Sequence, residues 1–178
     1  MVCFRTGIVN KTYIDHTDHM RQLFNASKLF IVEICSNKKY IHGGFYLHHL
    51  AIDKRFSEYN TATPADILAS HTVEKQDDAE VEADILEIQR LLAPTRIVIV
   101  SHYNSKQNGQ YIAPRNDLIC LLERICVKHA IPFVNPTSVL AYPQAEVMTS
   151  DLGHYTEKGI SEFSKYMNNY IRELGYCG

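Results

Sequence analysis

The sequence predicts an α/β fold in which a parallel sheet lies between two layers of helices, and three observations lead to it. Short apolar runs rich in β-branched residues, typical of strands buried on both faces, occur three times. Longer segments repeat their apolar residues every three or four positions, as amphipathic helices do. Strands and helices alternate, which is the order of a three-layer α/β/α domain with right-handed crossovers. The length of 178 residues suits a single domain over residues 1–178.

The expected elements follow in order along the chain. The first helical periodicity covers residues 13–25, and the apolar run from Leu29 to Cys35 is the first strand. Residues 38–77 are the least regular part, where we expect an elaborated connection with one or two short helices. The remaining predicted elements are a helix over 81–92, a strand over 97–100, a helix over 114–125, a strand over 131–134 and a helix over 157–174. Pro94 ends the first of these helices, and Pro114 suits the first turn of the next.

The composition is that of a soluble globular protein. A formal charge of -2 gives no sign of nucleic-acid or anionic-membrane binding, and no apolar run is long enough to span a bilayer. Residues 1–11 lack the segments of a secretion signal, so we expect a cytoplasmic protein. Cysteines without a C-x-x-C pair are expected to be reduced, with Cys35 and Cys120 in the core and Cys126 a further core candidate. The acids and histidines of residues 15–19 have no third, distant ligand, and no metal site is predicted.

The stretch from Asp151 to Gly159 carries the clearest chemical pattern. It places an acid three positions before His154, in a Gly-containing turn that opens onto the last predicted helix. A carboxylate there can hydrogen-bond one ring nitrogen and stabilise the imidazolium, which leaves the other nitrogen free to take a proton from a nucleophile. The alternative is that Asp151 only caps a turn and that His154 is an ordinary surface residue.

Polar residues also follow two of the predicted strands. Ser36 and Asn37 come after the first strand, and the Ser101–Asn104 stretch comes after the second. Ligands of parallel α/β sheets bind beyond the carboxyl ends of the strands, so we expect these positions to converge with His154 on one rim. His102 and Asn104 are the predicted substrate-binding residues.

The stretch from Asp151 to Gly159 resembles the last motif of the GDSL/SGNH hydrolase superfamily, in which Asp-x-x-His is followed by a Gly five residues after the histidine. The order of elements over residues 26–175 is also similar. The resemblance implies a flavodoxin-like, SGNH-hydrolase-like fold. It also sets residues 35–38 beside a Gly-x-Asn-Asp motif, in which Asn37 would donate to an oxyanion, although both the Gly and the Asp are replaced.

The family begins with a strand followed by Gly-Asp-Ser, whose serine is the nucleophile, and residues 1–28 show no such pattern. The sheet is therefore expected to lack its first strand or strands. Either the sequence is truncated upstream, or the chain is a remnant that kept the Asp–His end and lost the nucleophile. Three residues are considered as stand-ins. Cys3 has a glycine four positions later, while Ser101 and Ser36 lie at strand ends, where serine is more often a turn residue.

The resemblance implies hydrolysis of a small or carbohydrate-linked ester by a serine-type mechanism that needs no cofactor or metal. The competing hypothesis is a catalytically inactive SGNH-like module for binding or assembly. A lost strand would expose a sheet edge, which could pair with a second copy of the chain. A nucleotide or phosphate binder ranks last, because no Gly-rich turn follows a strand.

Overall fold

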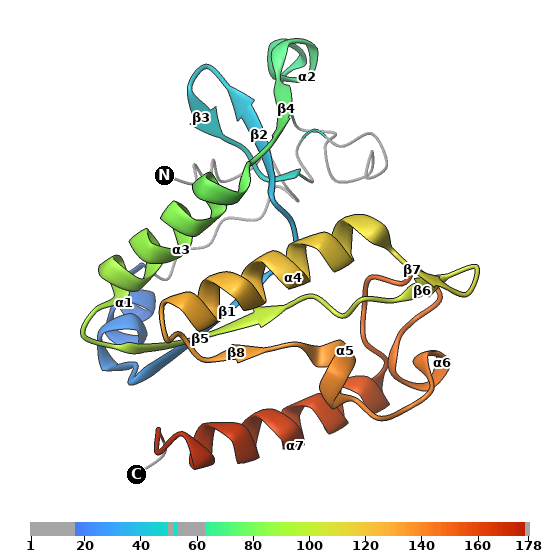
Figure 1. Ribbon diagram of the computed structural model, residues 1–178. Helices are drawn as coiled ribbons and strands as arrows, with labels where there is room; N and C mark the ends of the chain where they lie inside the picture. The colour runs from blue at the N-terminus through green and yellow to red at the C-terminus, as the bar shows by residue number, and fades with distance from the viewer. Residues whose placement is uncertain (1–16, 50–51, 53–62, 177–178) are drawn as a thin grey trace. The chain divides into compact units, whose positions relative to one another are not determined.

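The computed structural model describes residues 17–49, 52 and 63–176 (Figure 1). The chain divides into two compact units. The smaller unit holds residues 1–26 and 37–81, and the larger unit holds residues 27–36 and 82–178. The single domain expected over residues 1–178 stays a prediction.

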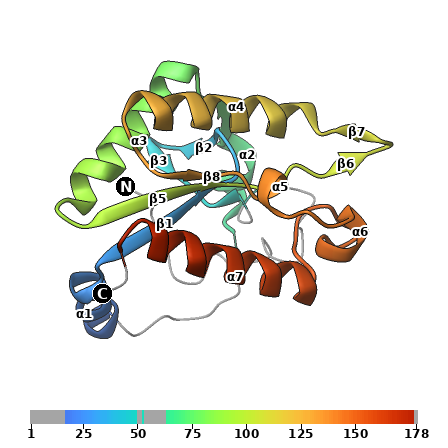
Figure 2. The ribbon, with the colours of Figure 1, turned by 60° about the horizontal axis from the view of Figure 1, so that its bottom comes forward.

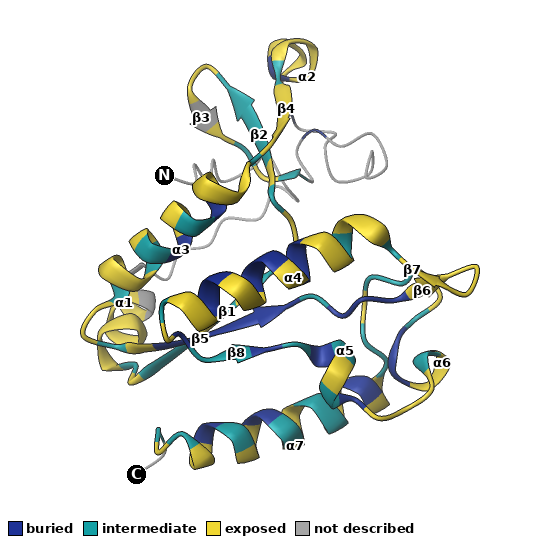
Figure 3. Cartoon of the chain, in the orientation of Figure 1, coloured by how far each residue is buried: buried dark blue, intermediate teal, exposed yellow. Residues whose placement is uncertain are grey.

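A three-stranded parallel sheet forms the centre of the larger unit. Its strands are β1 (Leu29–Ile34), β5 (Arg96–Ser101) and β8 (Phe133–Val134), in the order β1-β5-β8. All three were expected from their apolar runs. The middle strand β5 is buried from its second residue to its last, because it has a partner on each side and helices over both faces (Figure 3).

Helices cover both faces of this sheet, as Figures 1 and 2 show. On one face, α7 (Glu157–Glu173) packs Met167 and Ile171 against Val98 and Val100 of β5. The opposite face carries α4 (Ala113–Lys128), whose inner residues are buried from Leu118 to Cys126. The three-layer α/β/α arrangement is therefore confirmed. No helix in the described part of the chain is long and apolar enough for a membrane span.

Helix α3 (Asp78–Leu92) begins in the smaller unit and continues in the larger one. Within the larger unit, Glu82 accepts hydrogen bonds from Lys128, at 2.6 Å, and from His129. These bonds tie α3 to the end of α4. Short elements complete the larger unit: β6 (Lys106–Gln107), β7 (Gln110–Tyr111), α5 (Pro136–Val139) and α6 (Gln144–Val147).

Strand β1 differs from the prediction that both of its faces are buried. Its residues alternate between partly buried and exposed, and Ile31 is 51% exposed. Among the described residues β1 pairs only with β5, so it lies at the edge of the sheet. An edge strand has neighbours on one side only, which is why β-branched composition alone overestimated its burial.

The cysteine prediction is corrected in two of three cases. Cys126 lies buried in α4, as expected of a small apolar side chain. Cys35 and Cys120 are exposed. Cys35 follows the last residue of an edge strand, and Cys120 lies on the outward side of α4, so neither position faces the core.

The smaller unit contains an antiparallel sheet that was not expected. Its strands are β2 (Lys38–His42), β3 (Phe45–Tyr46) and β4 (Thr72–Lys75), in the order β3-β2-β4, and its helices are α1 (Thr17–Ala26) and α2 (Ala65–Ser70). Gly43 and Gly44 join β2 to β3 with φ angles of 55° and 79°, which a tight hairpin turn requires and glycine adopts freely. The small core holds Ile52 and Ile67.

Candidate active site

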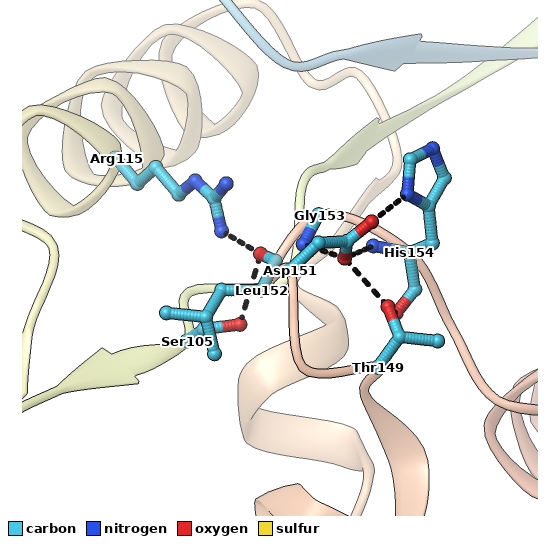
Figure 4. Close-up of polar contacts among 7 residues, drawn as sticks. All are labelled: Ser105, Arg115, Thr149, Asp151, Leu152, Gly153 and His154. Atoms are coloured by element: carbon cyan, nitrogen blue, oxygen red, sulfur yellow. Dashed lines mark hydrogen bonds and ion pairs between the residues drawn. The ribbon is translucent and has the colours of Figure 1, made fainter.

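The predicted Asp151–His154 pair is formed. His154 Nδ1 lies 2.6 Å from Asp151 Oδ2, in a loop between α6 and α7 (Figure 4). The carboxylate can only accept a hydrogen bond, so Nδ1 carries the proton and Nε2 of the neutral ring has a free lone pair. The His154 side chain is 81% exposed, and Nε2 makes no hydrogen bond to any other described residue. The arrangement leaves a proton acceptor facing solvent.

The second oxygen of the Asp151 carboxylate organises the loop. Oδ1 accepts hydrogen bonds from Thr149 Oγ1 at 2.5 Å, from the Gly153 amide at 2.8 Å and from the His154 amide at 3.1 Å. These bonds, led by the one from Thr149 and joined by the one from the His154 ring, hold the pKa of Asp151 far below its usual value. Asp151 is therefore ionised throughout the physiological pH range.

Leu152, between the two members of the pair, has a left-handed backbone with φ of 59°. This conformation costs a residue with a side chain about 1 kcal/mol. Its carbonyl oxygen accepts hydrogen bonds from Arg115 Nη1 at 2.5 Å and from Ser105 Oγ at 3.2 Å (Figure 4). Arg115 lies in the first turn of α4, and Ser105 is fully buried. Two side chains anchored in the body of the unit therefore hold the strained residue in place.

The flanks of the loop are joined to each other. Met148 and Tyr155 form an antiparallel bridge, and the Thr156 amide donates to the Val147 carbonyl at 3.0 Å. The ring of Tyr155 stacks on Phe163 of α7 at 5.8 Å and meets Tyr103 edge-on at 6.2 Å. Burial, with a smaller contribution from the charge of Glu33, raises the pKa of Tyr155. The pair thus projects from a base packed by aromatic rings.

The lowered pKa of Asp151 predicts a pH-dependent contribution to stability. A carboxyl whose pKa is lower in the folded chain stabilises the fold fully above its unfolded value, about pH 4, and loses this effect as pH falls through the folded value. We expect the difference in Tm between the wild type and Asp151→Asn to be largest at neutral pH and to shrink below about pH 4. Thermal unfolding across this range measures it, and a difference that stays constant would contradict the prediction.

A second histidine on this rim is also paired with an acid. His102 Nδ1 lies 3.0 Å from Oε1 of Glu33. His102 follows β5 directly and its side chain is 17% exposed, whereas the Glu33 side chain, in β1, is 52% exposed. The predicted substrate-binding residue His102 therefore lies at the carboxyl end of the sheet with a partner that the sequence did not indicate.

Two other predicted residues at the end of β5 are buried. Ser101 is fully buried, and its hydroxyl has no hydrogen-bond partner in the described part of the chain. A nucleophilic role would require this segment to move. Asn104 is 3% exposed; its amide nitrogen donates to Asn116 at 3.4 Å, and its backbone N–H donates to Thr137 at 2.6 Å. Asn104 fixes the loop between β5 and α4, and its substrate-binding role stays a prediction.

The remaining candidates lie around β1 and beyond it. Ser36 is exposed just after the strand. Beside it, the thiol of Cys35 is partly packed, which together with the Glu33 carboxylate raises its pKa. Asn37 belongs to the smaller unit, where its side-chain amide donates to the Gln76 carbonyl at 3.4 Å, so its oxyanion role stays a prediction. Cys3 lies outside the described residues.

Sequence patterns did not indicate four residues that shape this site, namely Glu33, Ser105, Arg115 and Thr149. Thr149 could have been found, because Thr-x-Asp-x-Gly is a sequence that favours a side-chain-capped turn. The other three act across long sequence separations and follow only from the fold. In the described ranges no three His, Cys, Asp or Glu side chains are grouped as metal ligands would be.

Comparison with known proteins places the chain in a family. It is 26% identical over 172 residues to the Vi polysaccharide biosynthesis protein TviD of Salmonella typhi, a match that covers 75% of this chain and 21% of that protein. The chain thus spans about one fifth of the length of this relative. No solved structure matches the chain. The GDSL/SGNH resemblance stays a prediction, whereas residues 53–172 match the model of the TviD N-terminal domain. Because that match covers more than half of the sequence, the chain belongs to the TviD N-terminal domain family.

Proposed function

We propose that the Asp151–His154 pair is the acid–base centre of an enzyme of the SGNH type that cleaves or transfers acyl esters on carbohydrate. The observation that carries this proposal is the geometry of the pair. A 2.6 Å bond fixes the protonated nitrogen on an ionised carboxylate, and the other nitrogen is open to solvent. This is the arrangement that general-base activation of a hydroxyl or thiol needs.

In the proposed reaction, Nε2 of His154 takes the proton of the attacking group as that group bonds to the acyl carbon. Asp151 stabilises the imidazolium that forms, and its bonds to Thr149 and Gly153 keep the carboxylate in place. The C–O bond of the ester then breaks, and the leaving alkoxide takes up a proton. The attacking group is water or a hydroxyl or thiol within reach of Nε2.

The proposed substrate class rests on the family. The relative in Salmonella typhi is named for Vi polysaccharide biosynthesis, which supports a carbohydrate rather than a lipid or peptide ester. His102 and Asn104 are proposed to bind the sugar. The chain spans about one fifth of the length of that relative. The proposal therefore covers only the ester chemistry of this domain and not the other activities of the relative.

The test is acetate release from an O-acetylated sugar and from 4-nitrophenyl acetate. We expect the wild type to release acetate and His154→Gln to be inactive on both esters, because its side chain cannot act as the base. His129→Gln is the matched control. It removes another histidine bonded to a carboxylate, but one at the end of α4 that leads into β8, away in the sequence from the loop between α6 and α7. Equal activity of wild type and His154→Gln would refute the proposal.

The second candidate is a non-catalytic module for binding or assembly, and the exposed edge of β1 favours it. Ile31 is half exposed there, and no described strand pairs with the outer side of β1. Such an edge can pair with a strand of a second copy. Light scattering on the purified chain measures its oligomeric state and tests this candidate. An inactive dimer that Ile31→Lys converts to a monomer would support the non-catalytic module.

A further inference from the structure

The described residues of the larger unit form three histidine–carboxylate pairs, His154–Asp151, His102–Glu33 and His129–Glu82, and the proposed function uses only the first. The second is His102 with Glu33, which are 69 residues apart in the sequence and come from neighbouring strands of the sheet. Both members lie toward the carboxyl end of the parallel strands, the edge where ligands of such sheets bind. The pair is therefore placed as a functional group would be.

The two side chains project from the same face of the sheet. Glu33 is in register with Val100, and in neighbouring parallel strands residues in register point to the same side. His102 comes two positions after Val100, and side chains two positions apart along extended backbone point to the same face. The 3.0 Å bond between His102 and Glu33 agrees with this placement. The face is the one that α7 covers, because Val100 packs on Met167 and Ile171.

The same reasoning that assigns the His154 tautomer applies to His102. The Glu33 carboxylate accepts, so Nδ1 of His102 carries a proton and Nε2 is the open position. Nε2 has no hydrogen bond to another described residue. It is also not among the buried, unpartnered polar atoms of the described chain, which are Ser101 Oγ and Asn104 Oδ1. The nitrogen therefore reaches solvent, although the ring as a whole is only 17% exposed.

A contact between aromatic rings connects this pair to the His154 loop. The ring of Tyr103, the residue that follows His102, meets the ring of Tyr155, the residue that follows His154, edge-on with 6.2 Å between centroids. The two pairs differ in shelter, since the His154 side chain is 81% exposed. A sheltered imidazole and an open one at the same end of the sheet suit an active site in which one ring takes the proton of the attacking group and the other gives a proton to the leaving group.

We propose that His102 is the general acid that protonates the leaving sugar oxygen, with Glu33 as its positioning residue. In the step, the protonated ring gives its Nε2 proton to the alkoxide as the acyl C–O bond breaks. His154 has meanwhile gained the proton of the attacking hydroxyl, so the protons balance. Exchange with solvent then returns both rings to their starting states. This inference rests on the proposed ester chemistry.

The experiment compares two esters that differ in leaving group. A sugar alkoxide needs a proton to leave, whereas 4-nitrophenolate leaves without one. His102→Gln is expected to lower kcat for the O-acetylated sugar by about 100-fold with KM unchanged, whereas loss of a residue that only bound the sugar would raise KM. For 4-nitrophenyl acetate kcat should change by less than about 3-fold. Glu33→Gln changes an exposed side chain and should lower activity on the sugar ester selectively, as His102→Gln does. It replaces His102→Gln in the test if that variant does not fold. A loss shared equally by both esters, or no loss on either, overturns the inference.

Failure of this inference differs from failure of the proposed function. If His154→Gln is inactive while His102→Gln behaves as wild type on both esters, His102 is not the acid and the proposed function stands. If His102→Gln is selective while His154→Gln stays active, His102 acts without His154. A wild type that cleaves neither ester refutes both proposals.

Discussion

Gly159→Ala is expected to destabilise the fold by about 3 kcal/mol, the upper end of the usual range for overpacking. A Cβ added at this position would lie 2.2 Å from the carbonyl oxygen of Val147 and 3.1 Å from Cδ1 of Tyr155. The nearest atom belongs to backbone, and the Thr156 amide already holds that carbonyl in place. The better helix propensity of alanine, about 1 kcal/mol, cannot offset the clash. Urea unfolding measures the loss.

Gly153→Ala is the matched control, six residues earlier in the same region. Its added Cβ would lie 3.7 Å from Asp151 Oδ1, an ordinary contact, and its backbone is not left-handed. The expected change in unfolding free energy is within about 0.5 kcal/mol. If the two variants were equally stable, the close approach of α7 to Val147 would not be the reason for glycine at position 159.

Thr156 and Gly159 join the His154 loop to the first turn of α7. Thr156 caps α7 by accepting from the Gly159 amide at 3.1 Å, and the same hydroxyl donates to the Glu146 carbonyl at 2.6 Å. The first turn of α7 thus lies directly on α6, and only glycine permits this approach. His154 is held between these two anchored segments.

Sequence periodicity predicted the larger unit well. The last helix, expected over 157–174, spans Glu157–Glu173, and the strand expected over 97–100 spans Arg96–Ser101. These elements have one dominant signal each, a helical stripe or an apolar run, and burial follows from it. In residues 38–77 the strands are short, and β4 is exposed at every residue, so no alternation reveals it.

The candidate site was predictable where its residues are local in sequence. Asp151 and His154 are three positions apart, and the turn between them carries its own signals. Glu33 belongs to a strand that was expected to be buried on both faces, and its side chain is instead 52% exposed and bonded to His102. That bond depends on the register of two parallel strands far apart in the chain, and the edge position of β1 sets its exposure. Neither is encoded in a local pattern.

Asp151→Asn is expected to lower kcat by about 10³- to 10⁴-fold, on the scale seen when the acid of a catalytic triad becomes an amide. The amide oxygen can still accept from Thr149, Gly153 and the His154 backbone, so the loop keeps its shape. Its NH₂ group then faces the imidazole and donates to Nδ1, which moves the ring proton to Nε2. A protonated Nε2 cannot take the proton of the attacking group. Steady-state kinetics on the O-acetylated sugar, with kcat and KM separated, measures the effect.

Glu82→Gln makes the same chemical change in a pair outside the site. Glu82 accepts from His129 and Lys128 between α3 and α4, and its replacement should leave kcat unchanged. A small effect of Asp151→Asn, or an equal effect of Glu82→Gln, would mean that the tautomer of His154 does not control the reaction. A large effect on kcat with KM unchanged would show that the carboxylate acts on the proton transfer and not on substrate binding, because only interactions stronger in the transition state alter kcat alone.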